Sequence, residues 1–407
     1  MRKNGIDKRL FDMDGGVCAP SGFFANGVFC GIAMTNPEHA DTPKEDLAII
    51  TCEKRASTAC VFSAGGIACP SVAVTQKHLK SNGGRAQAIV LSGGVANCLE
   101  NGSNIIENFC RDLERKAGIS RDEIVVISVG ELGKNFSQTA YLQGVDLLVK
   151  GLENTDFASR KVARVLAFDA KKANQTAFSF RLGDTPCKMG VVYQKGIHSE
   201  NALSGLVCLI TTDACITPAL LQKALDSAVK DSFDTLCLDG ANSPSDTVCI
   251  MANGNAGNYQ ISAEDTEYDK FRYFLTQTLL TICQKIAIDN AKTGVFTCRV
   301  EGAKSKRVAR ETAKALASSP AVKSGLLQGR VNADEAVCIL HGIGERVAFS
   351  QITLSVKSEK GEAVLFEDNK RAGLCESALE KILSATQTEI CLKIGQGNYS
   401  ATAIGTI

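Results

Sequence analysis

The sequence predicts an α+β protein with layered sheets. The chain has 407 residues, which is more than one small domain requires. A hydrophobic content of 44% and a charged content of 22% are ordinary for a packed protein and exclude wholesale disorder. Short runs rich in Val and Ile are mixed with amphipathic segments without strict alternation, and this mixture favours layered sheets with helices.

The first half of the chain contains four apolar runs that predict buried strands, because Val and Ile favour strands. They are residues 47–51, 59–62, 88–91 and 124–128. Residues 104–117 predict a helix, since Ile106, Phe109 and Leu113 share one face and Gly118 follows as a stop. A second helix is expected over residues 139–152.

The second half continues the mixture. Strands are expected at 206–211, 235–239, 247–252, 297–300, 335–340, 351–356 and 388–394. Helices are expected at 218–229, which starts with Pro218, at 268–288 and at 308–318. The helix over 268–288 is the longest, and its apolar residues recur at helical spacing.

Charge and hydropathy exclude several classes of protein. Lys and Arg number 45 against 44 Asp and Glu, so the net charge of +1 argues against nucleic-acid and membrane-surface binding. No apolar run has membrane-spanning length, which argues against an integral membrane protein. Residues 1–14 carry three Asp and no apolar core, so no secretory signal is expected and the cytoplasm is the expected compartment.

The chain has 17 cysteines, and most lie inside apolar runs. This placement indicates small buried hydrophobes in a reducing compartment. A disulfide framework is not expected. No Cys-x-x-Cys pair occurs and the four histidines are scattered, so neither zinc nor another metal is expected.

Four glycine-rich segments could place backbone amides around an anion or an oxyanion. They are residues 14–22, 92–97, 128–133 and 239–246. Alternatively, glycine only supplies positive φ in tight turns, and for each segment alone this is the favoured explanation. None matches a dinucleotide fingerprint or a P-loop.

Residues 195–206 bring together a lysine, a histidine, a carboxylate, an amide and two hydroxyls. A serine beside a base can act as a nucleophile. On composition alone a polar surface loop is favoured, and His198 fits a surface histidine better than a base.

Taken together, these segments resemble the ornithine acetyltransferases of arginine biosynthesis. The similar blocks follow the family's order almost from end to end. They are residues 15–23, 27–32, 46–50, 61–62 with Pro70, 85–99, 210–214, 246–254, 299–303 and 400–405.

The resemblance implies a self-processing acyltransferase. In this family the precursor cuts itself before a nucleophile, normally Thr, by an internal N→O acyl shift. The new α-amine then acts as general base, and its reference pKa of about 7.7–8.0 suits that role. Acetyl passes from N-acetylornithine to glutamate by a ping-pong route. A Thr-Gly pair forms the oxyanion hole, and no metal or organic cofactor is needed.

Matched residue by residue, the resemblance places the nucleophile at Ser204, with the cut between Leu203 and Ser204. Lys195 and Asn201 correspond to substrate-binding positions. The oxyanion pair falls on Val129 and Gly130, so the hydroxyl donor is replaced by an isopropyl group. Losing one such donor typically costs about 10²–10³ in rate.

Several other positions depart from the family pattern. The spacing from lysine to nucleophile is two residues shorter than usual. Residues 167–169 lack both hydroxyls of the family's Thr-Thr-Asp block, and residues 289–293 lack its acidic substrate-binding residue. The chain has no Trp and stops at Ile407, where the family continues through a segment that contributes to the substrate site.

Three functions therefore stay open. The chain is an acetyltransferase acting on small amino acids, a non-catalytic relative that binds or assembles, or an acyltransferase with another substrate. The resemblance also implies sheets sandwiched between helices, a main domain over 1–284 and a smaller C-terminal domain over 285–407. A homo-oligomer, or pairing with a paralogue, is expected.

Overall fold

The computed structural model describes most of the chain. The described residues are 10–32, 44–65, 67–96, 98, 102–131, 138–167, 173–196, 205–238, 243–344, 347–373 and 376–407. They belong to two units, one of Met1–Ser227 with Gly240–Thr278 and one of Ala228–Asp239 with Leu279–Ile407. The expected division after residue 284 concerns domains that fold on their own, and it stays a prediction.

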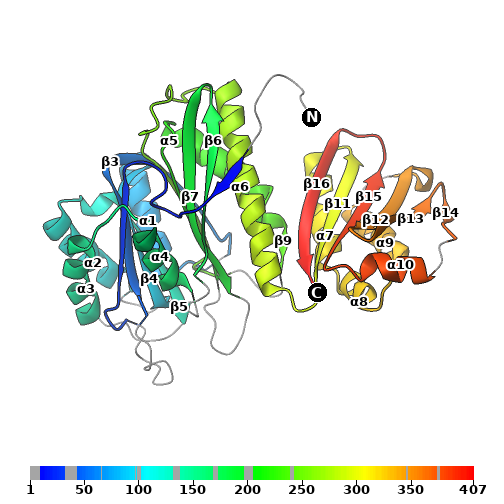
Figure 1. The fold of residues 1–407 in the computed structure, drawn as a ribbon, viewed down its shortest axis with the longest axis horizontal. Helices are drawn as coiled ribbons and strands as arrows, with labels where there is room; N and C mark the ends of the chain where they lie inside the picture. The colour runs from blue at the N-terminus through cyan, green and yellow to red at the C-terminus, as the bar shows by residue number, and fades with distance from the viewer. Residues whose placement is uncertain are drawn as a thin grey trace. The chain divides into compact units, whose positions relative to one another are not determined.

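The first unit is built on one long β-sheet (Figure 1). Its strand order is β1-β6-β7-β8-β10-β3-β4-β5, and β2 pairs with β3 outside this order. The strands are β1 (Phe11–Met13), β2 (Phe23–Val28), β3 (Leu47–Phe62), β4 (Arg85–Val95), β5 (Ile124–Glu131), β6 (Gln175–Leu182), β7 (Thr185–Gly196), β8 (Gly205–Thr212) and β10 (Thr247–Ala252).

Strand β3 joins two layers of this sheet. Its residues 47–51 pair with β4, its residues 57–62 pair with β10, and the register shifts between Thr51 and Ala56. One buried cluster contains Ile127 of β5 together with Leu209 of β8. The two parts of the sheet therefore face one another across a shared apolar core.

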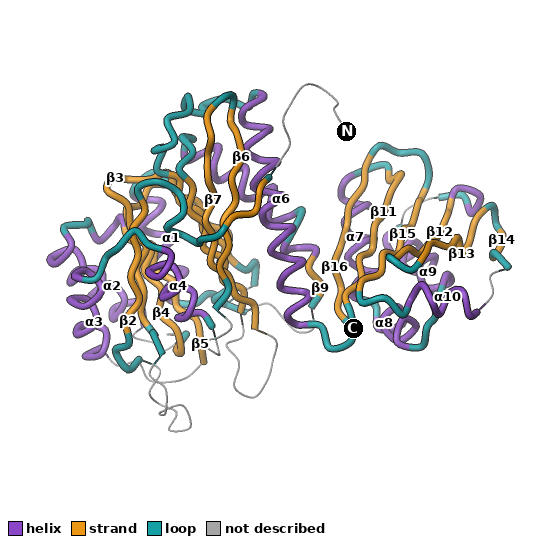
Figure 2. The backbone as a smooth tube through the Cα atoms, in the orientation of Figure 1, coloured by secondary structure: helices purple, strands orange, loops and turns teal. Residues whose placement is uncertain are grey.

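Helices cover the outer faces of the layers (Figure 2). They are α1 (Pro70–Ser81), α2 (Gly102–Ala117), α3 (Gln138–Lys150), α5 (Pro218–Lys230) and α6 (Thr266–Asn290). Helix α4 (Asp156–Leu166) lies in the shared core instead, because its buried residues belong to the same cluster as Ile127 and Leu209. Phe109 of α2 meets Tyr141 of α3 edge to face, with ring centroids 4.9 Å apart. Phe274 of α6 packs on Phe180 of β6 at 5.0 Å. The first unit is a sandwich of two sheet layers between helices.

The second unit has its own sheet, in the order β14-β13-β12-β15-β11-β16-β9. Its strands are β9 (Leu236–Cys237), β11 (Val295–Ala303), β12 (Ile352–Ser358), β13 (Gly361–Glu367), β14 (Lys370–Arg371), β15 (Gln387–Ile394) and β16 (Tyr399–Thr406). Its further helices are α7 (Lys306–Ser318), α8 (Pro320–Leu327), α9 (Ala333–Ile343) and α10 (Glu376–Leu383). Their apolar faces share one buried cluster with the sheet.

The α+β class is confirmed, but two expected strands differ. Residues 335–340 lie in helix α9, so the strand expected there is wrong. The Asn332 side chain caps α9 by accepting the N–H of Asp334, and Gly344 ends it with φ +77°. Ala336 and Leu340, four residues apart, are its buried face. The strand expected over 235–239 is only the two-residue β9, preceded by a 3₁₀ turn.

Candidate functional site

The predicted nucleophile position borders the start of β8. This strand is buried along its whole length between β7 and β10. Gly205, its first residue, pairs with Gly196 at the end of β7, and Lys195 pairs with Leu206. Residues 197–204 connect these paired ends. Ser204 and Asn201 are among them and lie outside the described residues.

A buried carboxylate holds the first residues of β8. Asp246 Oδ1 accepts the N–H of Leu206, and Oδ2 accepts the N–H of Ser243 at 3.0 Å. Ser243 Oγ lies 2.9 Å from Ser245 Oγ. Asp246 and Ser245 are both buried. This cluster fixes the backbone two residues from the predicted cleavage point.

Gly205 fits tightly against that cluster. Its φ is +146°, and a Cβ there would lie 3.3 Å from Asp246 Oδ1 and 3.3 Å from Ser245 Oγ. A backbone in this region is accessible to glycine and strained for other residues. The residue that follows the predicted nucleophile is therefore constrained to glycine by its conformation.

Val129 and Gly130 lie at the end of β5, which runs parallel to β4. The Val129 side chain is buried in the core cluster that also contains Val207 of β8. Gly130 has φ +150° and pairs with Gly94, and a Cβ on Gly130 would lie 2.1 Å from the Gly94 carbonyl carbon. Close packing of two strands thus accounts for this glycine, and the pair offers only backbone N–H groups as donors.

The described site residues gather at one end of the first unit. Strand β5 approaches β8 although the two are not neighbours in the sheet. Figure 1 shows β5 and β7 ending at the same lower edge of the unit. Lys195 is partly exposed there and forms no ion pair with another described residue. The structure thus brings the ends of β5 and β7 to the start of β8.

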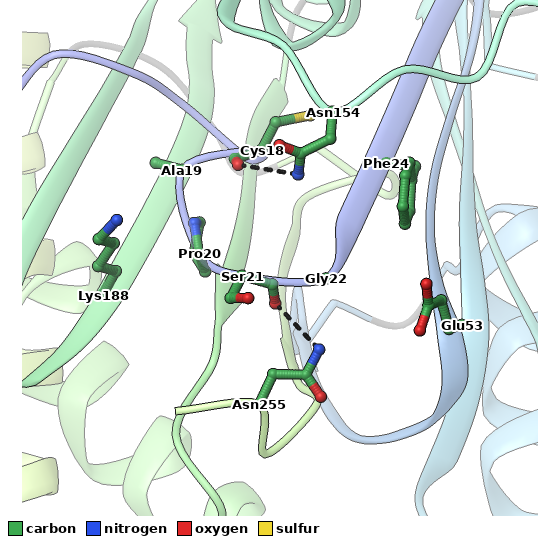
Figure 3. Close-up of a pocket in the computed structure, with 10 residues that line it drawn as sticks. All are labelled: Cys18, Ala19, Pro20, Ser21, Gly22, Phe24, Glu53, Asn154, Lys188 and Asn255. Atoms are coloured by element: carbon green, nitrogen blue, oxygen red, sulfur yellow. Dashed lines mark hydrogen bonds between the residues drawn. The ribbon is translucent and has the colours of Figure 1, made fainter. Parts of the chain in front are cut away.

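A cavity of about 520 Å³ lies elsewhere in this unit (Figure 3). It is lined by Cys18, Ala19, Pro20, Ser21, Gly22, Phe24, Glu53, Asn154, Lys188 and Asn255. Asp213 accepts the N–H of Lys188 at 2.7 Å and that of Ser21 at 3.3 Å, and both donor residues line the cavity. Burial raises the pKa of Asp213.

This cavity is remote from the predicted cleavage point. Asp213 directly follows β8, whereas the predicted nucleophile directly precedes it. A strand of this length spans roughly 26 Å at about 3.3 Å per residue. The glycine-rich segment 14–22 therefore does not share a site with Val129 and Gly130.

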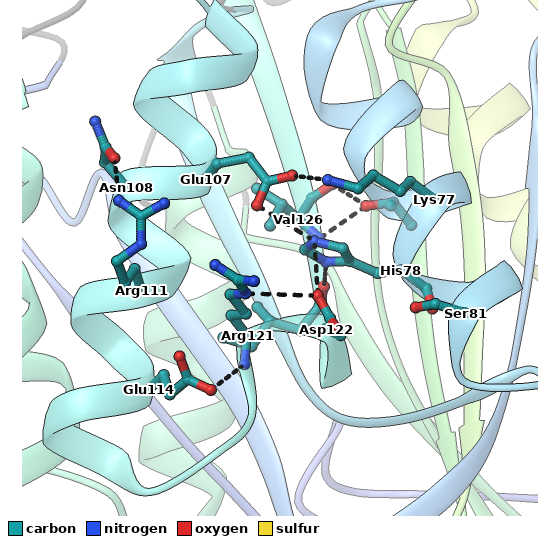
Figure 4. Close-up of polar contacts among 12 residues, drawn as sticks. Lys77, His78, Ser81, Glu107, Asn108, Arg111, Glu114, Arg121, Asp122 and Val126 are labelled. Atoms are coloured by element: carbon teal, nitrogen blue, oxygen red, sulfur yellow. Dashed lines mark hydrogen bonds and ion pairs between the residues drawn. The ribbon is translucent and has the colours of Figure 1, made fainter.

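The contacts of His78 link neighbouring elements of the first unit (Figure 4). It is buried in α1, with Nδ1 2.8 Å from the Ile124 carbonyl oxygen. Its Nε2 lies 3.8 Å from Glu107 and 3.9 Å from Asp122. Partial burial acts to raise the pKa of Glu107, but Lys77, 2.6 Å away, lowers it on balance. These contacts tie α1 to α2 and to the turn before β5.

No cluster of three or more His, Cys, Asp or Glu side chains suited to a metal occurs in the described part of the chain. Within the same ranges, no helix has the length and apolar character needed to cross a bilayer. Most of the described cysteines are buried, and burial raises the pKa of thiols such as Cys18 and Cys52 to about 12. Such thiols behave as small hydrophobes, as the sequence indicates.

The sequence analysis missed the role of Asp246. Neither the glycine-rich segment 239–246 nor the block 246–254 indicates a contact with Leu206, because the two residues are 40 positions apart in the chain. The one signal available was that Asp246 begins a block resembling the acetyltransferase family.

The family model and the curated relatives point to one family. The model described as "ArgJ family" matches residues 25–406. The arginine biosynthesis bifunctional protein ArgJ of Caldanaerobacter subterraneus is 26% identical over 396 residues, covering 97% of this chain and 95% of that protein. The Bacillus subtilis protein of the same name is 26% identical, covering 98% and 95%. A mitochondrial ArgJ protein of Aspergillus fumigatus is 27% identical, covering 95% and 85%.

Two solved structures are also similar. ArgJ from Bacillus halodurans matches with a TM-score of 0.42 and 20% identity, covering 48% of this chain and 98% of its own. The ornithine acetyltransferase of Mycobacterium tuberculosis, solved with ornithine, matches with a TM-score of 0.40 and 20% identity, covering 48% and 100%.

Proposed function

Since the chain belongs to the ArgJ family, we propose that it is a self-processing acyltransferase that moves acetyl from N-acetylornithine to glutamate in arginine biosynthesis. The observation that carries the proposal is the match over residues 25–406, which includes both sides of the cleavage point. The anchored start of β8 supports it, because Asp246 holds the N–H of Leu206 and Gly205 has a backbone conformation that favours glycine.

In the proposed maturation step, Ser204 Oγ attacks the Leu203 carbonyl carbon. The C–N bond to Ser204 breaks, the nitrogen takes the proton, and an ester joins Leu203 to Ser204 Oγ. Water then hydrolyses this ester, leaving a carboxylate on Leu203 and a free amine and hydroxyl on Ser204. The fixed backbone at Gly205 favours the step, since near-attack geometry supplies much of the rate in such reactions.

In the proposed transfer, the Ser204 α-amine takes the Oγ proton while Oγ attacks the acetyl carbonyl carbon. Ornithine leaves with the proton on its amine, and acetyl stays on Oγ. The glutamate amine then attacks this ester and regenerates the hydroxyl. Backbone N–H groups at Val129 and Gly130 are the proposed oxyanion donors, and Lys195 with Asn201 the proposed contacts for the substrate.

Ser204→Ala tests this assignment. We expect it to abolish chain cleavage and acetyl transfer, whereas Ser199→Ala, a change in the same connection, should preserve both. Acetylglutamate formed from N-acetylornithine would be measured by mass spectrometry. Cleavage that persists in Ser204→Ala would refute the nucleophile assignment. Cleavage without transfer in the natural chain would refute the substrates and point to another acyl donor.

We also expect a homo-oligomer, or a pair with a paralogue, and light scattering on the purified protein measures which forms. The compartment stays an expectation from the sequence, because curated relatives include bacterial proteins and fungal ones named mitochondrial.

A further inference from the structure

We propose that Cys69 and Cys98 form a reversible disulfide at the site end of the first unit. Their Sγ atoms are 3.1 Å apart, although the residues are 29 positions apart in the chain. A disulfide bond is about 2.05 Å long, so a relative shift of about 1 Å brings the sulfurs to bonding distance. No other function is assigned to either thiol by the proposed chemistry.

The two thiols differ in access, which sets the order of their reactions. Cys69 is fully buried in a small apolar cluster with Val72 and Ala96. Cys98 packs against this cluster and is partly exposed. Burial first, and then the neighbouring Cys98 thiol, raises the pKa of Cys69. An oxidant from solution therefore meets Cys98 first, and Cys69 acts as the resolving thiol.

The oxidant is a small-molecule disulfide such as oxidised glutathione. The Cys98 thiolate attacks one of its sulfurs, the S–S bond breaks, and one glutathione leaves as thiolate. Cys69 then loses its proton to that thiolate and attacks Cys98 Sγ, which releases the second glutathione. Two protein thiols are oxidised and one glutathione disulfide is reduced to two thiols, so atoms and electrons balance.

The bond would connect elements that border the candidate site. Cys69 caps the start of α1, and its N–H donates to the Pro244 carbonyl oxygen at 3.3 Å. Cys98 follows the end of β4, the strand on which Gly94 contacts Gly130. Oxidation would close a loop that contains α1 and β4 and would restrict the chain around the start of β10.

A second close pair of thiols provides a matched control. Cys60 of β3 and Cys249 of β10 are cross-strand partners in the sheet. The Cys249 thiol and burial raise the pKa of Cys60, and Cys249 is completely buried. With neither sulfur accessible, this pair should stay reduced under conditions that oxidise Cys69 and Cys98.

The test equilibrates the purified full chain in mixtures of reduced and oxidised glutathione. The protein is then denatured, free thiols are blocked with an alkylating agent, and peptides are mapped by mass spectrometry. We expect a linked Cys69–Cys98 peptide, reversed by dithiothreitol, with Cys60 and Cys249 alkylated. The disulfide should also raise the melting temperature by several degrees, an increase that Cys98→Ser removes without lowering that of the reduced protein.

Two results would overturn the proposal. One is full alkylation of Cys69 and Cys98 in every glutathione mixture. The other is a stable glutathione adduct on Cys98 that never resolves to the intramolecular bond. Neither readout depends on catalysis, so the proposal fails or stands independently of the proposed function.

Discussion

Gly130→Ala is expected to destabilise the first unit far more than Gly118→Ala. Both glycines have positive φ, +150° and +70°. No atom lies within 4 Å of a Cβ built on Gly118. Alanine there costs only the left-handed conformation, about 1–2 kcal/mol. The Gly118→Ala variant therefore measures the cost of backbone strain alone and serves as the control.

At Gly130 a steric cost is added to that strain. A Cβ would lie 2.1 Å from the carbonyl carbon of Gly94 and 2.3 Å from the nitrogen of Val95. Both atoms belong to the backbone of β4, which is paired on one side with β3 and on the other with β5. Overpacking costs about 1–3 kcal/mol where side chains adjust, and a paired backbone adjusts less.

The free energy of unfolding should therefore fall by about 4 kcal/mol or more in Gly130→Ala, a large share of the 5–15 kcal/mol typical of a native protein. Urea unfolding followed by circular dichroism measures both variants against the natural chain. A loss for Gly130→Ala within about 1 kcal/mol of that for Gly118→Ala would refute the close packing of β4 and β5.

Three further changes test other parts of the account. Asp246→Asn leaves one acceptor oxygen for two N–H groups, so we expect the free energy of unfolding in urea to fall by about 1–3 kcal/mol and chain cleavage to slow. The control Asp184→Asn, at an exposed position, should change neither. Asn332→Ala removes the cap of α9 and should cost about 1 kcal/mol, and an unchanged urea midpoint would contradict the capping role. Lys77→Met should cost about 0.2–1 kcal/mol at neutral pH, because Lys77 lowers the pKa of Glu107. A carboxyl whose pKa is lowered by folding stabilises the protein at pH values above its unfolded pKa. The stability difference between Lys77→Met and the natural chain should therefore vanish as the pH falls below the folded-state pKa of Glu107. A stability difference that persists in acid would exclude the ion pair as its cause.

Much of the core could be predicted from the sequence, because apolar runs and apolar residues at helical spacing indicate which side chains are buried. The runs at 47–51 and 124–128 form the first part of β3 and β5, and the run at 88–91 forms the middle of β4. The hairpin of β6 and β7 was not predicted, since its strands carry polar residues on their exposed side. The turn at Gly183, with φ +54°, was the available local signal.

Helix α9 shows the limit of reading short apolar runs. Residues 335–340 are rich enough in apolar side chains for a buried strand, and a run of this length does not separate the two structures. The Asn332 cap and the Gly344 stop distinguish them, and both lie outside the run. Prediction of the site from the sequence was limited in a similar way, because the contact from Asp246 to Leu206 exists only in the folded chain.

The most direct test of the proposed function is the intact mass of the purified protein under denaturing conditions. Cleavage gives fragments of 203 and 204 residues, which a gel separates poorly and mass spectrometry resolves. We predict two masses, matching residues 1–203 and 204–407. A single mass near 43.2 kDa would contradict self-processing, because Ser204 would then have no free α-amine to act as general base.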